Sequence, residues 1–164
     1  MTNKDHLTAD DDRRLLRRAI ALAGESVAND GGPFGAVIWC HGEIVAEASN
    51  RVVLDRDPTA HAEVRAIRLA AAKLATHDLS DCVLYTSCEP CPMCLGAVYW
   101  ARIGRVVYAC ERGDAEKAGF SDKLIYEEIA LDPAARQLQF HRITDVGGTE
   151  VFDAWDAHEG KVRY

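Results

Sequence analysis

No stretch of this sequence is long and apolar enough to predict a membrane-spanning helix, and residues 1–5 lack the basic and apolar regions of a secretory signal peptide. We therefore expect a cytoplasmic protein without a membrane partner, whose six cysteines stay reduced. Internal repeats, low-complexity tracts and linkers are absent as well. These absences predict a single domain over residues 1–164, a length that can bury a substantial core.

A surplus of basic residues is also missing. The formal net charge is −7, and residues 111–164 carry twelve Asp and Glu against seven Lys and Arg. Proteins that hold a polyphosphate backbone normally present a basic face. The charge balance therefore argues against nucleic acid as the substrate.

Hydrophobic periodicity and turn residues predict strands that alternate with helices. Such alternation indicates an α/β sandwich, and we expect its second and third helices to pack on the same face of the sheet. The predicted helices lie at residues 8–29, 60–75 and 91–101, and the predicted strands at residues 34–40, 43–49, 82–86 and 105–110.

Two short motifs carry the chemistry of this sequence, His61-Ala62-Glu63 and the Cys91-Pro92-Met93-Cys94 run that follows Glu89-Pro90. Cys91 and Cys94 are spaced i and i+3, so on a helix they lie on one face. Two thiolates and one imidazole suit a zinc ion and leave its fourth position open for water. Glu63 is then placed to handle the protons of that water without being a ligand. Both motifs begin predicted helices, whose positive ends favour thiolates and oxyanions.

A Cys-x-x-Cys pair alone has other interpretations: a structural zinc site, a redox pair, or two cysteines buried in a core. A structural site requires a fourth protein ligand, and a redox pair has no need of the His-x-Glu motif. Glu63 also argues against a non-enzymatic binding module with structural zinc, because such a site needs no acid that is not a ligand. Cys88 lies near the pair, and we interpret it as a supporting or inert residue.

The paired motifs match the H-x-E and P-C-x-x-C signature of zinc-dependent base deaminases. On longer stretches the sequence resembles the cytidine deaminase-like superfamily and, within it, the bacterial guanine deaminases. This resemblance implies an α/β fold that is a three-layer α/β/α sandwich with a five-stranded mixed sheet, one Zn²⁺ per chain, and a homodimer. It also implies that the C-terminal tail, residues 145–164, can be exchanged and close the active site of the partner. The similar stretches are residues 31–37, 57–64, 86–94, 100–102, 114–115, 118–120 and 154–155, and the terminal Tyr164.

The resemblance also assigns roles to individual residues. Glu63 would be the catalytic proton shuttle beside a metal held by His61, Cys91 and Cys94. The residues expected to contact the substrate are Asn50 as a hydrogen-bonding group, Phe34 and Trp100 as apolar walls, Ala62, Asp122 near the purine with Asp114 as the alternative acid, and Tyr164 in the closing tail. Each has a structural alternative: a turn residue for Asn50, core packing for the aromatic residues, and helix capping for the two acids.

The function implied by these residues is hydrolytic deamination of guanine to xanthine and ammonia. An acid such as Asp122 could accept hydrogen bonds from ring N–H groups, which favours guanine over adenine and cytosine. Guanosine, cytosine and triazine deaminases share the zinc chemistry and remain alternatives. For a tRNA adenosine deaminase we expect a basic C-terminal helix in place of this acidic tail.

Overall fold

The computed structural model describes residues 7–163, which fall into two compact units divided after Asp122. The first unit holds every strand of the described chain, whereas the second, Lys123–Tyr164, holds only helical segments. The expectation of one domain over residues 1–164 stays a prediction. No helix in the described part of the chain combines the length and the apolar character that crossing a bilayer requires.

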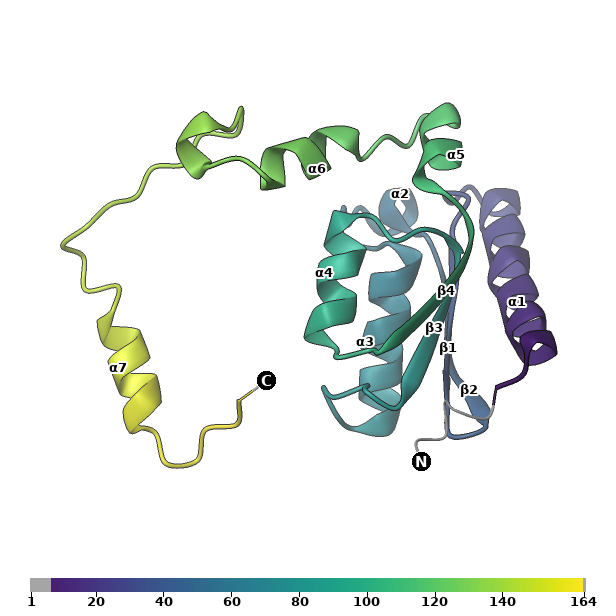
Figure 1. Ribbon diagram of the computed structural model, residues 1–164, viewed down its shortest axis with the longest axis horizontal. Coiled ribbons are helices and arrows are strands. Elements are labelled where there is room, and N and C mark those ends of the chain that lie inside the picture. Colours follow the sequence, from purple (N-terminus) through teal and green to yellow (C-terminus); the bar gives the residue numbers. More distant parts are fainter. Residues whose placement is uncertain (1–6, 164) are drawn as a thin grey trace. The chain divides into compact units, whose positions relative to one another are not determined.

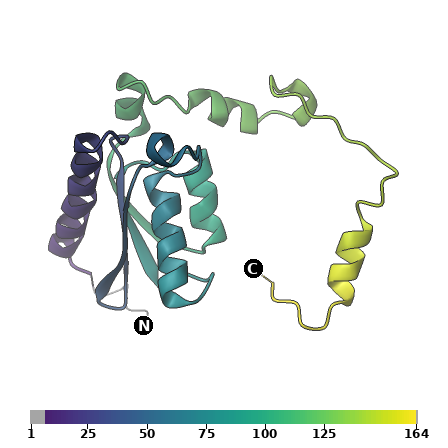
Figure 2. The same cartoon turned by 180° about the vertical axis from the view of Figure 1, so that it is seen from behind.

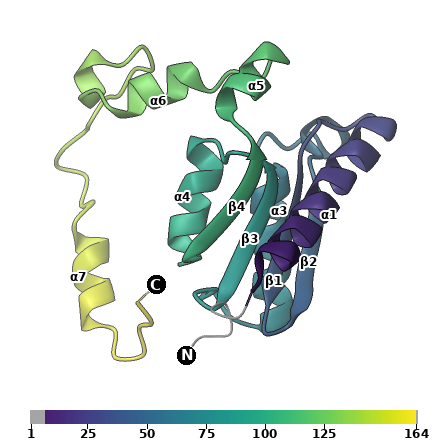
Figure 3. The same ribbon diagram turned by 45° about the vertical axis from the view of Figure 1, so that its right-hand side comes forward.

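The first unit is built on a four-stranded mixed sheet with the order β2-β1-β3-β4 (Figure 3). Strand β1 pairs antiparallel with both β2 and β3, and β3 pairs parallel with β4. Strands β2, β3 and β4 therefore run in one direction and β1 in the other. The strands are β1 (Gly35–Cys40), β2 (Glu43–Ser49), β3 (Cys82–Cys88) and β4 (Arg105–Cys110).

Helices cover both faces of this sheet (Figures 1 and 2). Helix α1 (Ala9–Ala28) lies on one face, and α3 (Ala62–Leu74) and α4 (Pro92–Trp100) lie on the other. Successive residues of β1 alternate between two clusters: Ile38 packs with Ala62 and Ala66, whereas Val37 packs with Leu15 and other residues of α1. The predicted three-layer α/β/α sandwich is confirmed, as is the placement of α3 and α4 on one face.

The expected fifth strand is absent from the described residues, so this part of the fold prediction is wrong. The chain leaves the sheet directly after β4 because Glu111 begins helix α5 (Arg112–Lys117) and forms a reciprocal capping box with Asp114. The described residues beyond α5 form helices α6 (Lys123–Ile129) and α7 (Glu150–Ala157) and a short 3₁₀ helix, η2 (Pro133–Ala135), and none of them pairs with β4.

Helix α1 is fixed at its start and against the sheet. Thr8 caps it and exchanges hydrogen bonds with Asp11 in a second capping box. Asp12, one turn after Thr8, accepts a 2.7 Å hydrogen bond from the buried Tyr85 of β3 and forms an ion pair with Arg105 of β4. These contacts set the distance between α1 and the sheet.

The second unit has no core of its own among its described helices. Neither α6, η2 nor α7 contains a buried residue. In α7, the apolar side chains of Val151, Phe152 and Trp155 are all exposed. Burial of apolar surface is the main force that stabilises a folded segment, so this unit gains little stability from its own contacts.

Gly35 lies close to the backbone of α1, and substituting it tests how α1 packs on the sheet. A Cβ atom added to Gly35 would lie 2.2 Å from the Ala19 carbonyl oxygen and 2.7 Å from the Ala23 nitrogen. We expect Gly35→Ala to lower the free energy of unfolding by about 3 kcal/mol, because α1 must move off β1. Gly24→Ala is the matched control: nothing lies within 4 Å of its added Cβ, and replacing a helical glycine gains about 0.5–1 kcal/mol. Urea unfolding measures both, and equal stability of the two variants would contradict this packing.

Candidate metal centre and active site

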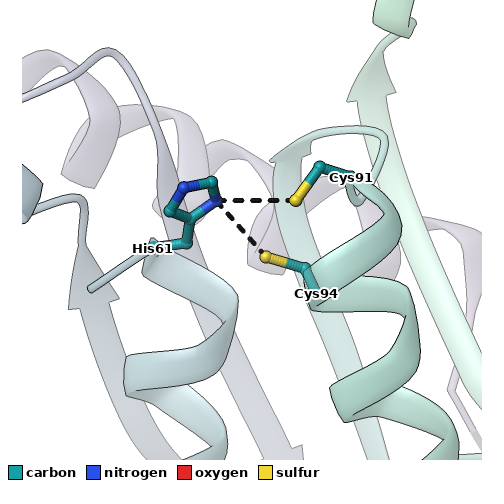
Figure 4. Close-up of side chains that lie close together, drawn as sticks. All are labelled: His61, Cys91 and Cys94. Carbon is teal, nitrogen blue, oxygen red and sulfur yellow. Dashed lines mark hydrogen bonds between the residues drawn. The ribbon is translucent and has the colours of Figure 1, made fainter. Parts of the chain in front are cut away.

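The two motifs meet because helices α3 and α4 begin at the same edge of the sheet. His61 is the N-cap residue of α3, Cys91 is the N-cap residue of α4, and Cys94 lies in the first turn of α4. Pro92 occupies the start of α4, where its missing N–H costs no hydrogen bond. Neither N-cap side chain bonds to its own helix, so the imidazole and the thiol are free to turn toward each other (Figure 4).

The three side chains have the geometry of a zinc site. The Nδ1 atom of His61 lies 3.6 Å from the Cys91 Sγ and 3.5 Å from the Cys94 Sγ. Tetrahedral zinc with usual bond lengths holds nitrogen and sulfur ligands about 3.5 Å apart. Among the described residues, the only group of potential ligand atoms close enough to share an ion consists of these three. Three protein ligands leave one position open, which is typical of a catalytic zinc site rather than a structural one.

The electrostatics of the protein alone favour a thiolate at this point. A hydrogen bond from the Cys94 thiol lowers the pKa of Cys91 to about 4, burial opposes this shift, and His61 adds to it. The same hydrogen bond and burial raise the pKa of Cys94. The hydrogen bond with Cys91 raises the pKa of His61. Because metal ligands must be deprotonated, binding of zinc displaces the remaining protons and weakens as the pH falls.

Glu63 lies beside these ligands without being one of them. It occupies the first turn of α3, and only 5% of it is exposed. Burial raises the pKa of its carboxyl group, the nearby Cys91 sulfur raises it further, and a hydrogen bond from its own backbone lowers it. A carboxyl group with a raised pKa can both accept and donate a proton near neutral pH.

Three of the residues expected to bind substrate lie at the same edge of the sheet. Asn50 directly follows β2, and its backbone nitrogen donates a 2.9 Å hydrogen bond to the carbonyl of Phe34, which directly precedes β1. Ala62 is fully buried between His61 and Glu63. Because β1 runs opposite to β2, its start and the end of β2 are neighbours. The structure thus brings Asn50, Phe34 and Ala62 to the edge where α3 and α4 begin.

The two candidate acids differ in their surroundings. Asp122 is half-buried, and its pKa is raised first by burial and then by the Cys91 sulfur and Glu89, while Arg112 lowers it. Asp114 is exposed, caps α5 and forms an ion pair with Lys117. Asp122 is therefore the acid that lies near the metal ligands, whereas the Asp114 carboxylate is engaged by Glu111 and Lys117 within α5 and its N-cap.

Trp100 is not brought to this site. Trp100 ends α4 and is 68% exposed, nine residues after the Cys91 N-cap, or about 13 Å along a helix. It therefore does not form an apolar wall in its own chain. Tyr164 lies outside the described residues.

Phe120 was not singled out from the sequence, yet it lies against one of the predicted site residues. Its ring contacts that of Phe34 edge to face, with centroids 5.1 Å apart. Residues 118–120 belong to the stretches that carry the resemblance, and this was the available signal. Two residues later comes Asp122, so one short segment supplies an aromatic ring and an acid.

Comparisons with known proteins agree with this geometry. A family model described as the cytidine and deoxycytidylate deaminase zinc-binding region matches residues 9–110. The guanine deaminase of Bacillus subtilis is 52% identical over 151 residues, which cover 92% of this chain and 97% of that protein. Its crystal structure superposes with a TM-score of 0.90 and 49% identity, covering 96% of this chain and 99% of the other. A tRNA-specific adenosine deaminase from Buchnera aphidicola is 37% identical over 108 residues, covering 66% of this chain and 67% of that protein.

The ligand set predicts how zinc content responds to loss of single cysteines. We expect purified protein to hold about one zinc ion per chain, and Cys94→Ala to hold almost none, because two ligands bind zinc far more weakly than three. Cys88→Ala is the matched control: Cys88 is buried, and its Sγ lies 3.7 Å from the Glu111 carbonyl, outside the ligand group. Elemental analysis after dialysis measures both variants. Loss of zinc from Cys88→Ala, or its retention in Cys94→Ala, would refute this ligand set.

Proposed function

The chain belongs to the family of the cytidine and deoxycytidylate deaminases, and on this premise we propose that it is a zinc-dependent hydrolase that converts guanine to xanthine and ammonia. The main evidence that guanine is the substrate is the match to a guanine deaminase over 97% of that protein's length. A match of 151 residues must extend far beyond residue 110, where the family model ends. It therefore includes much of the chain that lies outside the family model.

The rival functions lack this support. The tRNA-specific adenosine deaminase matches 66% of the chain, and the acidic balance of residues 111–164 is unfavourable for a polyphosphate backbone. A binding module with structural zinc would need a fourth protein ligand, and the described residues offer three. Guanosine differs from guanine by the sugar on N9, so the choice between them depends on how the site closes.

The chemistry divides between the metal and Glu63. A zinc ion held by these ligands supplies a Lewis acid that lowers the pKa of water to about 7 and makes hydroxide available at neutral pH. Glu63 accepts the proton that water releases and delivers it to a ring nitrogen as oxygen adds to C2. Glu63 then takes the proton that remains on the added oxygen and passes it to the amino group on C2, which leaves as ammonia while that oxygen becomes the C2 carbonyl of xanthine. Burial of Glu63 supports this double role because it raises the pKa of the carboxyl group, which can then hold a proton more readily than an exposed acid.

The remaining residues hold the ring. Phe34 and Phe120 provide an aromatic wall, Asn50 provides an amide, and Asp122 provides an acceptor for ring N–H groups. A buried polar group left unpaired costs about 1–3 kcal/mol, so a base with the wrong pattern of donors and acceptors binds poorly. This supports selection of guanine by Asp122 and Asn50.

A substrate screen tests the proposal directly. We expect the zinc-loaded protein to release ammonia from guanine, and much more slowly or not at all from guanosine, adenine, cytosine, cytidine and ammeline. We expect Glu63→Gln to lose several orders of magnitude in turnover because no group remains to transfer the proton. Ammonia release and xanthine formation measure both.

Zinc content is the control for this experiment. Glu63 is outside the ligand group, so Glu63→Gln should keep the zinc content of the unmodified protein. Turnover of guanine by Glu63→Gln at the full rate would end the proposed mechanism. Faster release of ammonia from guanosine than from guanine would replace the free base with the nucleoside as the substrate.

We further propose that the protein is a cytoplasmic homodimer in which residues 145–164, including Tyr164, close the active site of the partner. The absence of buried residues from α6, η2 and α7 supports this, because their exposed apolar side chains need another surface to cover them. The exposed Trp100 is equally available to a second subunit. Closure by a neighbouring chain would also limit what can extend from N9 of the purine.

Complementation between two inactive variants tests the exchange of the tail. One variant carries Glu63→Gln with an intact tail, and the other lacks residues 145–164 but keeps Glu63. We expect each alone to be inactive and a refolded mixture to recover activity, because mixed dimers place an intact tail over an intact site. The rate of xanthine formation measures recovery. A mixture as inactive as its components would show that the tail acts on its own chain.

A further inference from the structure

The chain around Asn50 is held by side chains from both faces of the sheet. The Ser26 hydroxyl, on α1, donates a 3.1 Å hydrogen bond to the carbonyl of Asn50. Arg65, on α3, donates a 2.6 Å hydrogen bond from Nη1 to the carbonyl of Ser49, the preceding residue. Since α1 and α3 lie on opposite faces, the end of β2 is clamped between them.

The Asn50 side chain is itself fixed in one orientation. Its Oδ1 atom accepts a 3.2 Å hydrogen bond from the backbone nitrogen of Val52, the first residue of the short helix α2 (Val52–Asp55). Only 8% of Asn50 is exposed. The amide oxygen is therefore engaged by Val52 in a nearly closed space, and Nδ2 is the atom of this side chain that can donate a hydrogen bond.

Two glycines lie close to Asn50. A Cβ atom on Gly32 would lie 3.0 Å from both Cγ and Oδ1 of Asn50. A Cβ atom on Gly31 would lie 2.8 Å from the Asn50 carbonyl oxygen and 2.3 Å from the Ser26 Oγ. Neither glycine is among the described residues with positive φ, so close approach rather than backbone conformation requires them.

We infer that Ser26, Gly32 and Arg65 are positioning residues that hold the Asn50 amide so that Nδ2 donates a hydrogen bond to an acceptor on the purine. The inference rests on the proposed function, in which Asn50 binds the base. It explains why Gly31-Gly32, far from the metal motifs in the sequence, belongs to the same site. None of the three positioning residues needs to touch the substrate.

A double-mutant cycle separates positioning from general stability. Gly32→Ala and Ser26→Ala are each measured in the unmodified chain and in Asn50→Ala. In the unmodified chain we expect each to lower kcat/KM for guanine about tenfold, mainly through a higher KM, because a misplaced donor is a lost hydrogen bond. In Asn50→Ala the Cγ and Oδ1 atoms are gone and the nearest remaining atom, Cβ, is 3.4 Å from the added methyl group. Gly32→Ala should then cost nothing further.

Two matched controls accompany the cycle. Tyr85→Phe removes a different hydroxyl contact between α1 and the sheet and should leave kcat/KM unchanged. Arg65→Met should behave like Ser26→Ala, whereas Arg68→Met, on the exposed side of the same helix, should not. Equal losses of kcat/KM in the unmodified and Asn50→Ala backgrounds would overturn the inference, because the variants would then act without Asn50.

A second readout does not depend on turnover. In the zinc-loaded protein, ¹⁵N relaxation should report an ordered Asn50 side-chain amide, and Ser26→Ala should lower its order parameter below about 0.6, whereas Tyr85→Phe should not. An order parameter unchanged by Ser26→Ala would overturn the inference. An unmodified protein that fails to deaminate guanine would instead overturn the proposed function, and the relaxation result would still decide whether Ser26 positions Asn50.

Discussion

The direction of the four strands is the constraint on which the site depends. Because β2, β3 and β4 run one way and β1 runs the other, the ends of three strands and the start of the fourth share one edge of the sheet. Helix α4 follows β3 and must begin at that edge, and α3 begins there after β2 ends. In open α/β sheets ligands bind outside the carboxyl ends of the strands, and the candidate site of this chain lies at that place.

Charge and burial then give the groups at this edge different chemical properties. Two sulfurs and one imidazole nitrogen converge at distances that suit a tetrahedral ion, and the helix starts that carry them stabilise negative charge. Glu63 is buried beside them but is not a ligand, so its carboxyl group keeps its proton more readily than an exposed acid would. The pKa of Asp122, a half-buried group near Cys91, is raised as well, first by burial. One arrangement of the backbone thus places a candidate metal site and two acids with raised pKa values close together.

The chain beyond β4 differs from the sheet and its helices in how little apolar surface it buries. The first unit has two hydrophobic clusters, one on each face of the sheet, whereas the described helices of the second unit bury nothing. A segment of this kind gains little stability from its own contacts. The described residues hold no fifth strand, because the capping box at Glu111 turns the chain into α5 directly after β4.

The sequence by itself determined the ligands, the acid beside them, the four strands and the helices that carry the motifs. These features depend on spacing over a few residues, such as the i, i+3 pair of Cys91 and Cys94. Only the tertiary structure decided that Asp122 rather than Asp114 lies near Cys91, that Trp100 is exposed at the end of α4 opposite to Cys91, and that Phe120 contacts Phe34. It also decided that Ser26 and Arg65 clamp the chain at Asn50 from opposite faces. Strand pairing between distant segments sets these contacts, and no local pattern of residues encodes them.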